Sequence, residues 1–127
     1  MIKKKTATRL FALALPLLLC ACFKEKDLGY PEQITFPKEG GEMTIRGDVP
    51  FSHACIQDYK GNDGFMLPGE DSILYNEYKW LKVAYKETSL NTELKVYARP
   101  NTSSSERKLY IELYSGPEYH VVRVKQK

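Results

Sequence analysis

Apolar and polar residues alternate one by one through much of the second half of the chain. Four runs place an apolar residue at every second position: residues 81–85, 94–98, 109–113 and 122–124. Successive side chains of a β-strand point to opposite faces, so this period of two predicts strands with one buried and one solvated face. Beyond residue 31, no stretch repeats its apolar residues with a helical period of 3.6, which favours an all-β fold.

Three more short strands are predicted in the first half of the chain. Each rests on two apolar positions separated by one residue: Ile34 with Phe36, Met43 with Ile45, and Ala54 with Ile56. The glycine-rich segments 37–41 and 61–64 are predicted turns, because glycine adopts positive φ without a steric penalty. Residues 51–79 are the least regular part. Within them, residues 65–79 fit either a long loop or a short edge strand.

About seven strands separated by regular turns indicate an all-β, immunoglobulin-like β-sandwich. The last two strands also predict their own register. A short loop at residues 115–118 places Tyr114 opposite Tyr119 and sets Ile111 against Val122. A slip of one residue would turn the apolar residues of one strand toward solvent, so this register is well specified.

The N-terminal segment has the pattern of an export leader. Four basic residues within positions 1–9 precede an apolar stretch, residues 10–19, that is too short to span a bilayer as a permanent helix. Leu19, Cys20, Ala21 and Cys22 together resemble a bacterial lipoprotein cleavage site. The resemblance implies that residues 1–21 are a lipoprotein signal peptide and that Cys22 is the lipidation site, which would attach the protein to a membrane through its lipid. An ordinary secretory leader is the alternative.

Charge narrows the choice of partners once the leader is removed. The leader carries four of the 19 basic residues and no acidic residue, so residues 22–127 have 15 basic against 16 acidic residues and a net charge of −1. This balance disfavours nucleic acid as a partner. Residues 22–31 mix charges with a Gly-Tyr-Pro break, which predicts a lipidated tether ahead of a domain at residues 32–127.

Several short motifs resemble BACON domains (Bacteroidetes-associated carbohydrate-binding, often N-terminal). They are Ile34-Thr35-Phe36, Gly40-Gly41, Met43-Thr44-Ile45, Trp80-Leu81-Lys82-Val83, residues 101–107 with their Asn, Ser and Arg, and Val122-Arg123-Val124-Lys125-Gln126. The resemblance covers roughly residues 32–126, and residues 51–79 depart from it by being longer and less regular. It implies an immunoglobulin-like sandwich from a Bacteroidetes bacterium and an association with carbohydrate.

No arrangement of residues typical of catalysis is found, so the protein is predicted not to be an enzyme. The acidic residues are scattered over loops and polar faces without a convergent pair. His53 and His120 have no cysteine or carboxylate at the spacing of a metal site, so neither a metal nor another cofactor is expected. His120 is predicted to face inward at the end of the last hairpin.

Sugar binding is the more specific functional hypothesis. The C–H faces of sugar rings pack on aromatic side chains, and the sequence predicts two groups of them. The predicted register puts Tyr110, Tyr114 and Tyr119 on one solvent face with Glu112 and Arg123. A second aromatic group is formed by Tyr78 and Trp80, beside the irregular segment. Both groups also have a structural explanation, since tyrosine favours strands and Trp80 can fill a core.

Two functions are therefore expected to compete. One is a non-catalytic cell-envelope lipoprotein whose sandwich binds glycan, supporting its capture at the outer membrane. The other is a structural or protein-interaction lipoprotein without a glycan site, whose partner is a protein of the outer membrane. Phe23 follows Cys22 where inner-membrane lipoproteins carry Asp, which favours the outer membrane and leaves open which of its faces carries the domain.

Overall fold

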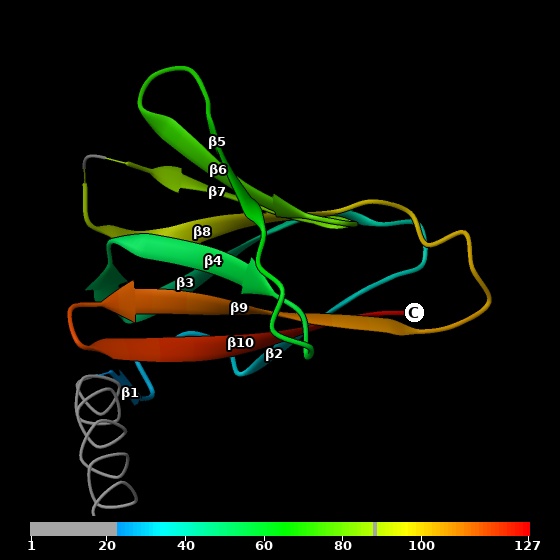
Figure 1. Ribbon diagram of the computed structural model, residues 1–127, viewed down its shortest axis with the longest axis horizontal. Coiled ribbons are helices and arrows are strands. Elements are labelled where there is room, and N and C mark those ends of the chain that lie inside the picture. Colours follow the sequence, from blue (N-terminus) through cyan, green and yellow to red (C-terminus); the bar gives the residue numbers. More distant parts are fainter. Residues whose placement is uncertain (1–22, 88) are drawn as a thin grey trace, which may run out of the picture.

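The protein folds as a β-sandwich of two five-stranded sheets (Figure 1). The computed structural model describes residues 23–87 and 89–127, and this part of the chain contains strands and no helix. The strands are β1 (Lys24–Glu25), β2 (Gln33–Phe36), β3 (Gly41–Phe51), β4 (His53–Gln57), β5 (Phe65–Pro68), β6 (Ile73–Tyr78), β7 (Leu81–Lys86), β8 (Asn91–Ala98), β9 (Arg107–Ser115) and β10 (Glu118–Gln126). The all-β sandwich is confirmed, with ten strands in place of about seven.

The two sheets have different edges. In the A sheet the order is β1-β10-β9-β4, and β2 also pairs with β10. β1 and β2 run parallel to β10 and meet opposite ends of it, at Glu118–Tyr119 and at residues 123–126 respectively. In the B sheet the order is β3-β8-β7-β6-β5, with every pair antiparallel.

The core lies between the two sheets and follows the alternating pattern. The A sheet contributes Ile56, Ile111 and Val122, which are fully buried. The B sheet contributes Val83, Leu94 and Val96 from the facing layer, and Phe36 and Phe51 fill the space between the layers. Burying each such side chain stabilises the fold by about 1.5–3 kcal/mol, so the alternation in the sequence is the main source of stability.

The register predicted for the last hairpin is confirmed. Tyr119 pairs with Tyr114, Val122 with Ile111 and Val124 with Leu109. The first turn is also confirmed, because Gly40 has a φ of 81° and donates its N–H to the Pro37 carbonyl. A residue with a Cβ would be strained at that φ.

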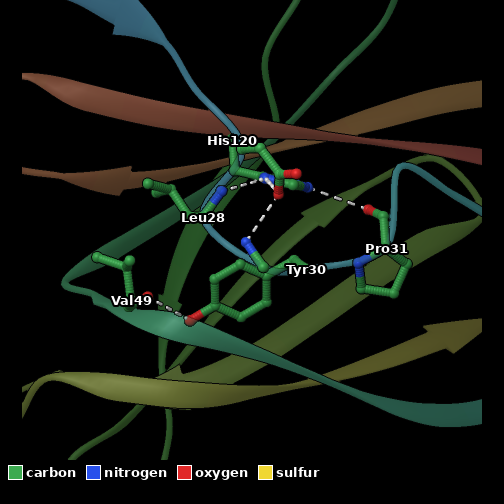
Figure 2. Close-up of polar contacts among 7 residues, drawn as sticks. Leu28, Tyr30, Pro31, Val49 and His120 are labelled. Carbon is green, nitrogen blue, oxygen red and sulfur yellow. Dashed lines mark hydrogen bonds and ion pairs between the residues drawn. The ribbon is translucent and has the colours of Figure 1, made fainter.

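Part of the segment predicted as a tether belongs to the folded domain. Leu28 and Tyr30 are buried in the core, and Lys24–Glu25 forms β1 against β10. The backbone N–H of Leu28 donates to Nδ1 of His120 at 3.0 Å, and Nε2 of His120 lies 3.2 Å from the Pro31 carbonyl oxygen (Figure 2). His120 therefore faces inward as predicted, and it fastens the N-terminal segment to the hairpin.

Tyr30 is the second anchor of this segment. Its hydroxyl donates to the Val49 carbonyl at 2.8 Å (Figure 2), and burial, with Asp48 nearby, raises its pKa to about 12. Gly47 makes room for the ring, because a Cβ there would lie 2.4 Å from it. The alternation of Leu28 and Tyr30 was hidden in the sequence by the charges around it.

Residues 65–79, which the sequence left as a loop or an edge strand, form the β5–β6 hairpin. It projects from the B sheet in Figure 1, and β5 pairs with β6 alone among the described residues. Phe65, Met66 and Leu67 are exposed, whereas Asn76 on β6 is fully buried and accepts the N–H of Ile56.

The predicted lipidation site, Cys22, lies outside the described residues. Within the part of the chain that the structure describes, no helix is long and apolar enough to cross a membrane.

Candidate functional site

The outer face of the A sheet carries the tyrosines that the sequence singled out. At the tip of the last hairpin, the rings of Tyr114 and Tyr119 lie 5.6 Å apart between centroids and are tilted by 36°. The ring of His53 lies 5.8 Å from that of Tyr114. We call Tyr114, Tyr119 and Glu112 the tyrosine shelf.

The polar atoms of Tyr114, Glu112 and their neighbours are hydrogen-bonded to one another. The hydroxyl of Tyr114 and the amide of Gln57 both donate to Oε1 of Glu112, and the hydroxyl of Tyr110 donates to Oε1 of Gln57. Burial, with Glu112 nearby, raises the pKa of Tyr110, Tyr114 and Tyr119 above the usual range for tyrosine. The phenols therefore stay protonated at neutral pH, and two of them are engaged within the protein.

Arg123 shares this face, farther along β10. It pairs across the strands with Tyr110, but none of the cation–π contacts among the described residues joins these two side chains. The structure thus brings the five predicted residues of the last hairpin to one face, with Arg123 at the far end from the shelf.

The second predicted group, Tyr78 and Trp80, supports the fold. Trp80 is 7% exposed, which confirms its packing in the core, and the guanidinium of Arg107 lies over its ring at 4.8 Å. Tyr78 packs against the core, and its hydroxyl donates to Asp58 at 2.8 Å. Both rings thus take part in packing the core.

A cleft of about 660 Å³ opens where β4 ends and β9 continues without that neighbour. We call it the end cleft. Its walls come from four separate segments: the β4–β5 loop, the β6–β7 turn, the loop before β9, and the start of β9. The lining residues are Asp58, Tyr59, Lys60, Lys79, Trp80, Arg99, Pro100, Arg107, Lys108 and Leu109.

Asp58 fixes the loop that forms one wall of the end cleft. Its carboxylate accepts the backbone N–H groups of Lys60 and Asn62, the Asn62 side-chain amide and the Tyr78 hydroxyl. These bonds, led by the one from the Asn62 side chain, hold the pKa of Asp58 far below its ordinary value. The carboxylate of Asp58 thus already has its hydrogen-bond donors within the protein.

Tyr59 is held outward by this loop. Its side chain is 59% exposed, and its ring rests on that of Tyr110 with centroids 5.0 Å apart. It also lines a second cleft of about 370 Å³, formed with Gln33, Lys108, Arg123, Val124 and Lys125. Tyr59 and Lys108 border both clefts, which makes Tyr59 an aromatic platform between them.

The sequence pattern did not connect Tyr59 to Tyr110. The strong turn signal at residues 61–64 was the available clue, because exposed loops on a rigid sandwich often carry recognition residues. The contact itself could not be predicted, since Tyr59 and Tyr110 are far apart in the chain.

Among the described residues, no group of three His, Cys, Asp or Glu side chains is placed to hold a metal ion. Cys55 is half-buried on the outer face of the A sheet, and burial, with Asp63 nearby, raises its thiol pKa. A raised pKa makes it a poor nucleophile.

Comparison with known proteins agrees with the sandwich and with a binding role. Residues 70–127 match the sequence profile of the BACON family, described as "Putative binding domain, N-terminal". A solved structure described as "NMR structure of the protein from Bacteroides thetaiotaomicron" is similar over 80% of this chain and 85% of that one, with a TM-score of 0.56 and 14% identity. At that identity the likeness establishes the fold alone. No curated protein matches the chain.

The C-terminal part of the chain is thus similar to the BACON family. The matched residues run from just before β6 to the end of β10. They include the start of β9 and the β6–β7 turn, and so supply most walls of the end cleft. The wall that carries Tyr59 lies before them.

Proposed function

We propose that this protein is a non-catalytic lipoprotein of the cell envelope that binds carbohydrate in the end cleft. The observation that carries the proposal is Tyr59, an exposed ring seated on Tyr110 between two clefts. Sugar rings pack on such faces while polar groups around them orient the hydroxyls. The BACON match supports a binding role, and the family's name associates that role with carbohydrate.

The position of Tyr59 favours the end cleft over the tyrosine shelf. The Tyr114 hydroxyl and the Gln57 amide already donate to Glu112, so a ligand that bound Glu112 would have to break existing hydrogen bonds. A group that already has its partner gains little from a ligand, because hydrogen bonds are exchanged and not added. The end cleft offers a free ring and charged side chains.

Binding is tested by electrophoresis of the full chain in detergent, through gels that contain soluble polysaccharides. We expect retardation by at least one polysaccharide, and we expect Tyr59→Ala to weaken it about tenfold, the loss of one aromatic contact of about 1.4 kcal/mol. Tyr119→Ala is the matched control on the shelf and should change affinity less than about twofold. The reverse result would place the site on the shelf.

The envelope location is tested separately. With Cys22 lipidated, the chain should partition with outer-membrane vesicles, and mass spectrometry should find acyl chains on its N-terminal peptide. Two or more chains are needed for stable anchoring. Cys22→Ser should release the protein into the aqueous fraction. A wild-type chain without acyl mass would contradict this part of the proposal.

One observation favours protein interaction as the second candidate function. Phe65 and Leu67 on the open edge strand β5 are 73% and 45% exposed. An unpaired edge with apolar side chains is a template for strand addition by a partner protein. Failure of every polysaccharide to bind would leave this function as the better explanation.

A further inference from the structure

Positive charge is concentrated at the two clefts, although residues 22–127 carry a net charge of −1. Of the 15 basic residues in that part of the chain, seven line the clefts, and one acidic residue, Asp58, lines them too. The seven are Lys60, Lys79, Arg99, Arg107, Lys108, Arg123 and Lys125. Charges of one sign around a concave surface raise the local concentration of oppositely charged ligands.

Most of this charge is not balanced by carboxylates of the protein. Arg99 pairs with Glu77 at 2.8 Å, and Lys125 lies 3.9 Å from Glu106. Among the described residues, Lys60, Lys79, Lys108 and Arg123 make no ion pair. Asp58, the acid at the cleft, already accepts from four donors and does not neutralise them.

Strands β9 and β10 place positively charged residues next to one another beside the clefts. Lys108 of β9 and Lys125 of β10 are direct cross-strand partners, and Arg123 lies two residues along β10 on the same face. Like charges that face each other across strands destabilise a sheet. A ligand with negative charges would relieve the repulsion, and each charge-assisted hydrogen bond would add to its affinity.

We infer that the carbohydrate is an anionic polysaccharide that carries carboxylate or sulfate groups. Its sugar ring packs on Tyr59, and its negative groups are bound by Lys60, Lys108 and Arg123. This inference rests on the proposed function and names the chemical class of its ligand. The aromatic platform and the cations around it act together, so neither a neutral sugar nor a plain polyanion uses the whole site.

The test uses polysaccharide pairs that differ in charge alone. The full chain in detergent is titrated with dextran and dextran sulfate, and with polygalacturonate and its methyl ester. We expect the charged member of at least one pair to bind tenfold or more tightly, with the preference shrinking between about 50 and about 500 mM salt, where screening is stronger. Poly-glutamate and single-stranded DNA are the controls for charge alone, because they are polyanions but not polysaccharides.

Variants locate the site. Lys60→Gln combined with Lys108→Gln should weaken binding of the charged polysaccharide about tenfold or more, and Tyr59→Ala should weaken it as well. Lys86→Gln combined with Lys95→Gln removes the same charge from exposed positions on the B sheet and should change affinity less than about twofold. Thermal unfolding confirms that each variant is folded.

The outcomes separate the two proposals. Equal binding of charged and neutral polysaccharides would overturn the inference and leave the proposed function standing. Absence of binding by any polysaccharide would overturn the proposed function. Equally tight binding of poly-glutamate or DNA, or an equal loss in the B-sheet control pair, would also overturn the inference, since charge attraction alone would then explain the affinity.

Discussion

The tyrosine shelf and the end cleft both include residues of β9, but their polar groups have opposite surroundings. At the shelf, the Tyr114 hydroxyl and the Gln57 amide both donate to Glu112. At the end cleft, the cross-strand partner of Lys108 is Lys125 of the second cleft, and Lys60 extends from an exposed loop without an acidic partner among the described residues. The hydrogen bonds of the shelf stabilise the fold, whereas the like charges beside the cleft do not contribute to its stability.

This difference separates two kinds of aromatic surface. Aromatic residues beside a carboxylate and a guanidinium suggested a sugar site in the sequence, and the structure gathers them on one face. Tyr110, Tyr114 and Glu112 already make hydrogen bonds within the protein, however. The exposed ring lies elsewhere, on Tyr59, where a loop fixed by Asp58 holds it above Tyr110. Side chains that have no partner within the protein are a better guide to a ligand site than residue type.

The largest effect on stability is expected at the shelf. Glu112→Ala removes the acceptor shared by Tyr114 and Gln57 and should lower the free energy of unfolding by about 1–2 kcal/mol, since half-buried donors lose their partner. Chemical denaturation measures it. Glu93→Ala, which removes an exposed ion pair with Arg46, is the control and should cost less than about 0.5 kcal/mol. Equal costs would mean that the shelf network is not structural.

An intermediate effect is expected at Asp58 and depends on pH. Folding lowers the pKa of this carboxyl, so its contribution to stability is complete above about pH 5 and is lost as the pH falls below about 4 toward the folded pKa. Asp58→Asn keeps the shape of the side chain but removes the titration. The melting temperature of the wild type should therefore fall toward that of the variant on acidification. Parallel melting curves from pH 7 to pH 2 would contradict this.

The smallest effect is expected at Lys108, with the opposite sign. Lys108→Gln removes one charge of the cross-strand pair with Lys125 and should leave stability unchanged or raise it by a few tenths to about 1 kcal/mol. Chemical denaturation at low salt is the sensitive measurement. A clear loss of stability would show that Lys108 is structural and would remove the contrast between the cleft and the shelf.

Much of the fold could be predicted because strand alternation is a local code. Leu109, Ile111 and Leu113 set the buried face of β9, and the short loop after it fixed the pairing with β10 residue by residue. The β5–β6 hairpin was not placed, since all four residues of β5 are exposed and the inward-facing Asn76 of β6 is polar. The alternation of apolar residues cannot reveal a strand such as β5, which buries no side chain. It also cannot reveal one such as β6, whose fully buried residue is an asparagine.

The end cleft was beyond prediction for a different reason. Its residues lie on four segments that are distant in sequence, and their meeting depends on where β4 stops relative to β9. Gln57, the last residue of β4, pairs with Tyr110, which leaves Lys108 and Arg107 without that neighbour. Strand ends are the least certain part of any sequence-based prediction.

The place where β1 joins β10 determines how far the clefts would lie from the membrane. β1 joins β10 at Glu118, whereas the second cleft reaches Lys125 on the same strand. Seven steps of about 3.3 Å separate these positions by roughly 23 Å. With Cys22 held in lipid, as we propose, the tip of the β9–β10 hairpin would lie nearest the membrane. The two positively charged clefts would then lie away from the lipid headgroups, where polymers in the surrounding fluid can reach them.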